Sequence, residues 1–253
     1  MRSFEAGRYE ARLARSGDDV RRAQGLRWRA FRAARGLGAE GGFDIDGFDP
    51  VCRHVLVEDR QSGALVAAFR LLPLTDGTEI WRSYSAQYYE LSALADYRGR
   101  MVEMGRFCLD PDCHDPDILR VAWGAVTRYV DDEGVEMLFG CSSFMGTDAA
   151  AYLDAFAMLR DRHLAPKRWL PKVKAPRVFR FAARLRGRRP DHRRALQGLP
   201  PLLRTYLTMG GWVSDHAVVD QDLGTMHVFT GLEVRMIPPS RSRTLRGVAK
   251  SCL

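Results

Sequence analysis

Two apolar runs, HVLV and ALVAAFRLLP, flank the polar residues Gln61-Ser62-Gly63. Such runs on either side of a glycine-containing turn predict a β-hairpin over residues 54–73. Residues 101–109 and 137–143 are predicted to be strands, and residues 117–132 between them a helix. Strands that alternate with helices after an antiparallel start predict an α/β fold with a mixed central sheet.

The remaining segments extend this pattern to the whole chain. Residues 18–35 and 147–162 are predicted to be helices, and the segment AVVDQDLGTMHVFTGLEV is expected to form a strand pair that turns near Leu223-Gly224. A chain of 253 residues can bury one good core. We therefore expect a single domain over residues 1–253, ending in a flexible basic tail at about 238–253.

The second half carries much of the net charge of +8. Within a basic segment at about 166–210, Val178, Phe181, Ala182 and Leu185 recur at helical spacing, which predicts a basic amphipathic helix. Such a helix either binds an acidic carrier protein or an anionic membrane, or simply docks on the core of the protein by its apolar stripe. The basic side chains in question are Lys167, Arg168, Lys172, Lys174, Arg177, Arg180 and Arg184.

The sequence lacks the motifs that are typical of several other classes of protein. The N-terminus has no apolar signal region, and no run of about 18 apolar residues occurs. Cys108, Cys113 and His114 have no second ligand pair at zinc spacing, so we expect unpaired thiols and no metal. Phosphate-binding loops and nucleic-acid motifs are also missing. We therefore expect a cytoplasmic protein without a nucleic-acid partner, and a peripheral position on the inner membrane is a further option.

Three aspartates, Asp44, Asp46 and Asp49, cluster in the loop GLGAEGGFDIDGFDP. Carboxylates this close repel one another unless solvent or a cation compensates them. The cluster is therefore either a solvated loop or a cradle for an ammonium group.

Glu103 and Arg106 interrupt the otherwise apolar strand MVEMGRFCL, and Arg70 interrupts the second strand of the hairpin. A charged side chain in such a strand is costly unless it is paired or faces a cleft. These residues are therefore either structural ion pairs or the lining of a polar cleft in the sheet. Ser142 and Ser143 follow Cys141 at the end of a buried strand, which is where α/β sheets meet ligands.

The order of these residues resembles two known families. Arg27 with Phe31, the three aspartates, Arg70 and Glu103-x-x-Arg106 resemble the acyl-homoserine-lactone synthases. The chain is more similar to the ornithine–acyl carrier protein N-acyltransferases, over about residues 20–232. The matching segments, in order, are DIDGFDPVCRHVLVED, EMGRFCLDPD, LFGCSSFMGTD, RHLAPKRWLP, LPPLLRTYLTMGGWV and AVVDQDLGTMHVF.

The resemblance implies a GNAT-like fold, with a basic helical insertion in the second half, and an acyltransferase activity. The expected reaction moves a 3-hydroxyacyl group from acyl carrier protein to the α-amine of L-ornithine and gives lyso-ornithine lipid. Related enzymes acylate glutamine instead. No bound cofactor is expected, because the donor is carried on the phosphopantetheine of the carrier. The acidic, proline-interrupted stretch LDPDCHDPDILR agrees with this donor, since a diphosphate-binding loop is basic and rich in glycine.

Roles for single residues follow from the same resemblance. Glu103 is expected to act as general base, and Arg106 to orient Glu103 or the substrate carboxylate. Ser142 or Ser143 is expected to donate to the thioester oxygen. The remaining candidates are substrate-binding residues: Arg27 and Arg70 for a carboxylate or the acyl carrier, Phe31, and Asp44, Asp46 and Asp49 for the ornithine δ-ammonium.

Two other functions remain open. A homoserine-lactone synthase has the same fold and uses S-adenosylmethionine as acceptor, so its lactone product would identify it. A basic module without catalytic activity that binds anionic lipid or nucleic acid would fit the charge of +8. Salt-dependent binding without acyl transfer would favour that module.

Overall fold

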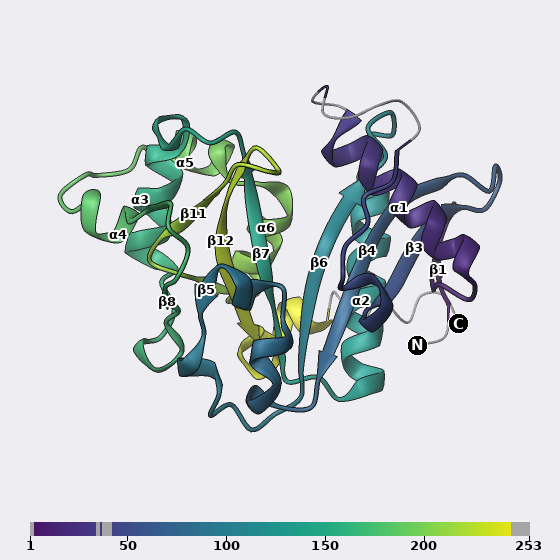
Figure 1. Cartoon of the computed structure of the whole chain (residues 1–253), viewed down its shortest axis with the longest axis horizontal. Coiled ribbons are helices and arrows are strands. Elements are labelled where there is room, and N and C mark those ends of the chain that lie inside the picture. Colours follow the sequence, from purple (N-terminus) through teal and green to yellow (C-terminus); the bar gives the residue numbers. More distant parts are fainter. Residues whose placement is uncertain (1–2, 34–35, 37–41, 244–253) are drawn as a thin grey trace. The chain divides into compact units, whose positions relative to one another are not determined.

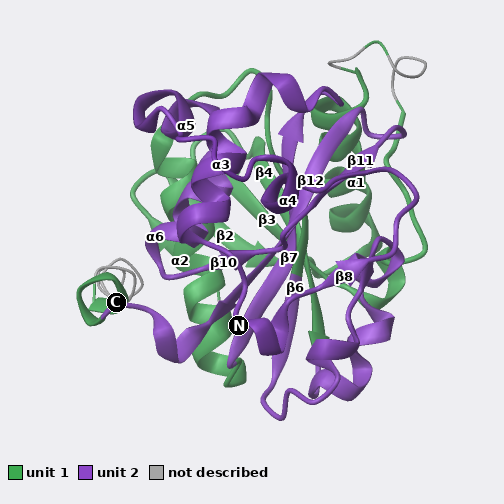
Figure 2. Ribbon diagram, turned by 90° about the vertical axis from the view of Figure 1, so that its left-hand side faces the viewer, with its two compact units in different colours: residues 1–73, 104–135, 239–253 green, residues 74–103, 136–238 purple. Residues whose placement is uncertain are grey.

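The structure is a computed structural model that describes residues 3–33, 36 and 42–243. The chain divides into two compact units (Figure 2). Unit 1 comprises residues 1–73, 104–135 and 239–253, and unit 2 comprises residues 74–103 and 136–238. Of the predicted tail, residues 244–253 lie outside the described residues, as do residues 37–41 of the glycine-rich loop.

Unit 1 contains strands in the order β1-β2-β3-β4-β6. The pairs β1–β2, β2–β3 and β3–β4 are antiparallel, so the predicted hairpin is confirmed as β3 and β4. The strand β6 begins in unit 2 and continues into unit 1. The strands are β1 (Phe4–Ala6), β2 (Tyr9–Leu13), β3 (Arg53–Asp59), β4 (Leu65–Leu74) and β6 (Met101–Leu109).

Two helices lie on opposite faces of these strands, α1 (Gly17–Phe31) and α2 (Pro116–Glu133) (Figures 1 and 2). The side chain of Ser16 caps α1 by accepting from Asp19 N, and Gly134, with a φ of 63°, ends α2 in the left-handed conformation. Helix α1 packs through Ala23 and Leu26 against Ala68 of β4. These contacts fix the helix beside the strands that carry Arg70 and Arg106.

Within unit 2 the strand order is β6-β7-β12-β11-β9, with β10 paired to β12. The pair β6–β7 is parallel, whereas β7–β12, β12–β11 and β11–β9 are antiparallel. The predicted mixed sheet is therefore confirmed. The strands are β7 (Met137–Met145), β9 (Val178–Phe179), β10 (Trp212–Val213), β11 (Ala217–Asp220) and β12 (Thr225–Glu233), and a separate pair is formed by β5 (Tyr89–Glu90) and β8 (Lys172–Val173).

The two faces of this sheet are covered by different layers (Figure 2). One face packs Phe144 and Met226 against a helical layer that contributes Phe156 and Phe181. That layer consists of α3 (Leu153–Arg162), α4 (Phe181–Arg184), α5 (His192–Gly198) and α6 (Pro201–Thr208). The other face meets the segment with the 3₁₀ turns η3 (Gly77–Arg82), η4 (Ser85–Gln87) and η5 (Ser92–Leu94), where Tyr89 donates its hydroxyl to His227 O over 2.8 Å.

Most predicted elements are confirmed within a few residues. The prediction of one basic amphipathic helix through Val178, Phe181, Ala182 and Leu185 is wrong, because Val178 and Phe179 pair with β11 and the helix α4 covers only residues 181–184. The predicted helix 18–35 ends earlier, at Phe31. None of the helices in the described part of the chain is both long and apolar enough to span a membrane.

Candidate active site

A set of ion pairs in unit 1 joins α1 to the loop before β3. Arg27 of α1 places its Nε 2.9 Å from Asp44 Oδ2 and its Nη1 2.6 Å from Asp49 Oδ1. The side chains of Arg27 and Asp44 are each only 1% exposed. Gln24 donates to Asp49 over 2.9 Å from the preceding turn of the helix. Helix α1 therefore anchors two of the three predicted aspartates.

Two strands bring further arginines to the same carboxylates. Arg70 on β4 contacts Asp46 over 2.5 Å and Asp49 over 2.8 Å. Arg106 on β6 lies 3.0 Å from Asp44 and 3.1 Å from Asp46. Three guanidinium groups thus face three carboxylates, and their charges compensate one another. We call these six residues the Arg–Asp cluster: Arg27, Arg70, Arg106, Asp44, Asp46 and Asp49.

Asp46 is the most accessible aspartate of the cluster, with 22% of its side chain exposed. Its Oδ1 accepts from Arg70 Nη1 and Phe48 N, and its Oδ2 accepts from Arg70 Nη2 and Arg106 Nη2. Burial acts to raise the pKa of Asp46, but the hydrogen bonds and the charge of Arg70 outweigh it and lower the pKa to about 2. The predicted ammonium cradle therefore consists of carboxylates that already have cationic partners.

Arg106 has an unusual backbone. Its φ of 52° is the only positive value at a non-glycine position in the described ranges. This left-handed conformation costs roughly 1–2 kcal/mol for a residue with a Cβ atom. Strain of this kind persists where the surroundings require it, and here the side chain reaches two carboxylates of the cluster.

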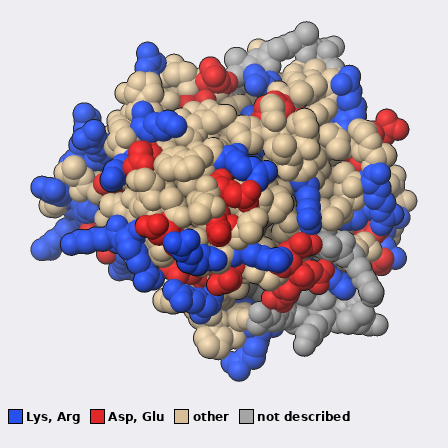
Figure 3. Space-filling view, turned by 60° about the horizontal axis from the view of Figure 1, so that its bottom comes forward, with Lys and Arg blue, Asp and Glu red and all other residues tan. Residues whose placement is uncertain are grey.

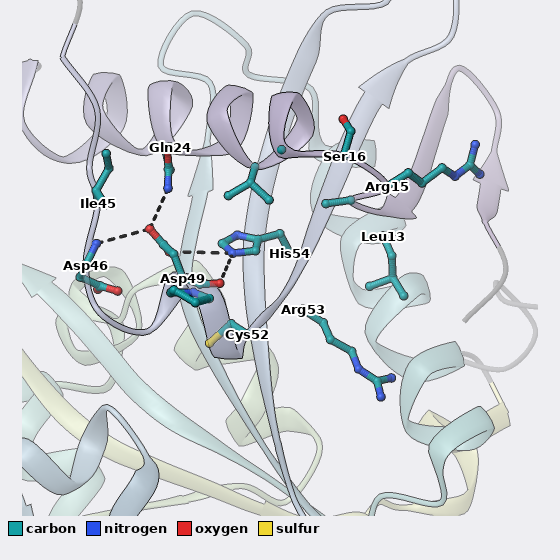
Figure 4. A pocket seen from close by; sticks show the side chains of 14 residues that line it. Leu13, Arg15, Ser16, Gln24, Ile45, Asp46, Asp49, Cys52, Arg53 and His54 are labelled. Atoms are coloured by element: carbon teal, nitrogen blue, oxygen red, sulfur yellow. Dashed lines mark hydrogen bonds and ion pairs between the residues drawn. The ribbon is translucent and has the colours of Figure 1, made fainter.

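A cavity of about 800 Å³ lies at the N-terminal end of α1 (Figure 4). Its wall includes Ser16, Ile45 and Arg53, and it opens onto Asp46 and Asp49 of the Arg–Asp cluster. His54 also lines it and contacts Asp49 O over 3.1 Å through Nε2 (Figure 4). Burial lowers the pKa of His54. The sequence pattern did not predict this cavity.

Glu103 lies in unit 2 and is 4% exposed. Its Oε1 accepts from the backbone N–H of Ser85 over 2.8 Å and from the Ser85 hydroxyl over 2.6 Å. Its Oε2 accepts from Tyr84 N over 2.7 Å. All three contacts use Glu103 as an acceptor, as an ionised carboxylate does. The turn at residues 83–87 thus orients the carboxylate that the sequence singled out.

The two predicted serines lie on opposite faces of β7, because successive side chains of a strand alternate. Ser142 is 3% exposed and its Oγ accepts from Thr230 over 2.9 Å, on the face covered by the helical layer. Ser143 is exposed and shares the other face with Cys141. Cys141 Sγ is 3.3 Å from Ser85 Oγ. Only Ser143 therefore lies on the face that carries the partner of Glu103.

Aromatic side chains continue this face of unit 2. The hydroxyls of Tyr84 and Tyr88 are 3.2 Å apart, and the Tyr88 ring meets the ring of His227 edge-on with centroids 5.0 Å apart. The hydroxyl of Tyr89 lies 3.1 Å from His227 Nδ1. Sequence reasoning missed all of these residues. The available signal was three tyrosines in the short stretch SYSAQYYE.

The other predicted residues make none of the contacts of the Arg–Asp cluster or of Glu103, although Lys174 reaches the turn at residues 83–87. Phe31 is partly buried and packs with Ala30 and Leu65 against the small core beneath α1. Lys174 donates to Ala86 O over 2.6 Å, and Lys172 lies 3.8 Å from Glu90. The remaining predicted basic residues are exposed in unit 2: Lys167, Arg168, Arg177, Arg180 and Arg184.

Comparison with known proteins defines the class. Residues 26–124 match the family profile described as acetyltransferase (GNAT) domain. Among solved structures, an N-acyl amino acid synthase from uncultured soil microbes is similar with a TM-score of 0.49 and 11% identity, over 91% of this chain and 94% of that chain. The profile match gives residues 26–124 the signature of a GNAT acetyltransferase domain.

Relatives of similar length identify the family. The L-ornithine N(alpha)-acyltransferase of Rhodobacter capsulatus is 34% identical over 87% of this chain and 88% of its own length. The protein of the same name from Brucella abortus is 30% identical over 91% of this chain and 86% of its own length. The chain belongs to the L-ornithine N(alpha)-acyltransferase family.

Proposed function

We propose that this enzyme transfers a 3-hydroxyacyl group from acyl carrier protein to the α-amine of L-ornithine and so forms lyso-ornithine lipid. The observation that carries the proposal is the 34% identity, over nearly the full length of both chains, to a protein named L-ornithine N(alpha)-acyltransferase. The alternative acceptor is glutamine. It shares the α-amine and the α-carboxylate but lacks the side-chain ammonium.

The segment between β6 and α2 supports a donor without a diphosphate. The N-terminus of a helix binds phosphate through free backbone N–H groups. In α2 the side chain of Asp115 already accepts from Asp117 N, and Asp117 adds a second acidic side chain in the first turn. Asp110, just after β6, pairs with Arg29 over 2.7 Å. This acidic helix start would repel the diphosphate of an acyl-CoA, whereas a carrier-bound phosphopantetheine presents none.

The reaction requires a neutral amine beside the thioester carbonyl. The amine nitrogen forms a bond to the carbonyl carbon, the carbon–sulfur bond breaks, and the phosphopantetheine sulfur leaves as a thiolate. We assign Glu103 to take the proton that the amine loses, directly or through one water. A base in this position contributes about 10²–10⁴-fold to the rate. The three donors from Tyr84 and Ser85 support this role because they fix the carboxylate in one orientation.

We assign the Arg–Asp cluster to hold the loop of residues 42–52 in place. Its six charges already compensate one another, and the acceptor positions of Asp46 are occupied by Arg70, Arg106 and Phe48 N. An ornithine δ-ammonium would have to displace an arginine to bind there. The oxyanion that forms on the thioester carbon requires a hydrogen-bond donor, and Ser143 is the better placed of the two predicted serines because it is exposed.

One experiment tests the reaction directly. The protein is incubated with 3-hydroxyacyl carrier protein, or with the matching 3-hydroxyacyl-CoA, and with ornithine, glutamine or lysine, and the products are identified by mass spectrometry. We expect N-acylornithine from the carrier-bound donor. Acylation of glutamine at an equal or higher rate would reject ornithine as the preferred acceptor. Equal turnover with the CoA thioester would reject the preference for the carrier.

A further inference from the structure

The stretch from Arg177 to Arg194 has an exceptional charge. It contains eight arginines and a single acidic residue, Asp191, in a chain whose net charge is +8. We call these side chains the arginine surface: Arg177, Arg180, Arg184, Arg186, Arg188, Arg189, Arg193 and Arg194. All of them are exposed. Basic side chains gather on the left-hand side of Figure 3, the side on which α4 lies in Figure 1.

The backbone beneath the arginine surface is firmly anchored. Phe181, Leu185 and Ala195 are buried in the core cluster of unit 2, and β9 pairs with β11. Arg188 pairs with Asp154 over 2.9 Å. Within residues 42–243, no carboxylate lies within ion-pair distance of Arg186, Arg189 or Arg193. The surface therefore presents several uncompensated positive charges from a fixed scaffold.

From Arg184 to Arg194 the arginine surface lies on the helical face of the sheet, whereas Arg177 and Arg180 flank the edge strand β9. Phe144 of β7 and Met226 of β12 point toward that layer. Cys141 and Ser143 alternate with Phe144 and so point to the opposite face, where Ser85 contacts both Cys141 and Glu103. An acyl carrier must deliver its thioester to the face of Glu103. The sheet separates that face from Arg186, Arg189 and Arg193.

We propose that the arginine surface binds an anionic phospholipid bilayer. Charge complementarity supports this partner, because basic residues near an anionic membrane each contribute about fivefold to binding. Leu196 on α5 is 41% exposed beside Arg193 and offers an apolar contact to the lipid. The inference rests on the proposed function in one respect. An N-acylated amino acid is an amphiphile that partitions into a bilayer, so an enzyme held there releases its product at its destination.

Vesicle sedimentation tests the proposal. The protein is mixed with vesicles of phosphatidylcholine alone or with about 30% phosphatidylglycerol, at low and at high salt. We expect binding only to the anionic vesicles, and weaker binding at high salt because salt screens the charges. The triple variant Arg186→Gln/Arg189→Gln/Arg193→Gln should bind on the order of 100-fold more weakly. The control Lys167→Gln/Arg168→Gln/Lys172→Gln removes equal charge elsewhere in unit 2 and should bind nearly as well as the wild type.

Acyl transfer without vesicles provides the second measurement. The arginine variant should keep its melting temperature and its kcat/KM with carrier-bound donor. Wild-type vesicle binding by that variant overturns the proposal, and so does equal binding to phosphatidylcholine alone. If the arginine variant has a raised KM for the carrier but unchanged vesicle binding, the arginine surface binds the carrier, and the membrane proposal is overturned. If the wild type transfers no acyl group, the proposed function fails, but the vesicle measurement still decides the membrane surface.

Discussion

The hydroxyl and the backbone N–H of Ser85 both donate to the same oxygen of Glu103, over 2.6 and 2.8 Å. Tyr84 N donates to the other oxygen over 2.7 Å. A charge inside an apolar strand is costly without such partners. These contacts therefore explain how β6 tolerates a carboxylate, and they are compatible with a structural role as well as with a base. Two substitutions separate these roles.

Glu103→Gln tests the base. The amide keeps the size of the side chain and one acceptor oxygen, but it does not take up a proton near neutral pH. If Glu103 is the base, kcat for acyl transfer from the carrier should fall by about 10²–10⁴-fold. Wild-type turnover by this variant would reject the assignment. Glu103→Ala should likewise abolish transfer, but it also leaves three donors without their acceptor.

Ser85→Ala tests the structural role of the contacts that hold Glu103. It removes one of the two hydrogen bonds from Ser85 and leaves the carboxylate in place. A hydrogen bond to a charged group contributes about 1.5–3 kcal/mol, so urea should unfold this variant earlier than the wild type. Its kcat should stay within about tenfold of the wild type. Loss of activity as large as in Glu103→Gln would show that orientation of the carboxylate limits the reaction.

Arg27→Ala tests the energetics of the Arg–Asp cluster. It leaves Asp44 and Asp49 buried without their helix-borne cation, which should lower the free energy of unfolding by about 3–5 kcal/mol. The matched control on α1 is Arg29→Ala. Arg29 is 52% exposed and pairs with Asp110, so its loss should cost about 0–1 kcal/mol. Equal urea midpoints for the two variants would contradict a buried, coupled cluster.

Arg106→Gly and Arg106→Ala test the backbone strain in β6. Both variants lose the contacts with Asp44 and Asp46. Glycine adopts a φ of 52° without steric cost, whereas alanine keeps the Cβ clash. Arg106→Gly should therefore be more stable than Arg106→Ala by about 1 kcal/mol. An alanine variant that is as stable as the glycine variant would show that the conformation is not strained.

Local signals in the sequence predicted much of the fold. Alternating apolar runs and a turn at Gln61-Ser62-Gly63 are enough to specify β3 and β4, and Gly134 ends α2 by its own conformational preference. The helix prediction for the basic segment failed because of a tertiary contact. Val178 shares a helical spacing with Phe181 and Leu185, but its backbone pairs with Val218 of β11. A sheet edge distant in sequence overrides a short helical pattern.

The sequence identified the charged residues of the candidate site but not the groups that they contact. A charge in an apolar strand signals that a partner exists, which identified Arg70, Glu103 and Arg106. The partner itself depends on the fold. Asp44 is 17 residues from Arg27, and Ser85 is 18 residues from Glu103, so no periodicity connects them. Backbone donors such as Tyr84 N leave no trace in the sequence at all.

The acid sensitivity of unit 2 should depend on His227. The Tyr89 hydroxyl donates to His227 O over 2.8 Å, so His227 Nδ1 donates to the hydroxyl oxygen, and the described residues offer His227 Nε2 no partner. Burial, with the charge of His216, lowers the pKa of His227 to about 3. The unfolded chain takes up this proton near pH 6.5 and the folded chain only near pH 3. The stability that the buried, neutral His227 contributes is therefore complete above about pH 6.5 and is lost as the pH falls toward 3.

Replacement of the imidazole should remove this dependence. Between about pH 6 and pH 4, one proton bound only by the unfolded state changes the free energy of unfolding by about 1.4 kcal/mol per pH unit. His227→Gln should lower the slope for the whole protein by about that amount, measured by urea unfolding at several pH values. The matched control is His192→Gln on the exposed side of α5. If both variants lower the slope equally, burial of His227 is not the cause. If His227→Gln keeps the wild-type slope, the folded protein takes up the proton as readily as the unfolded chain does.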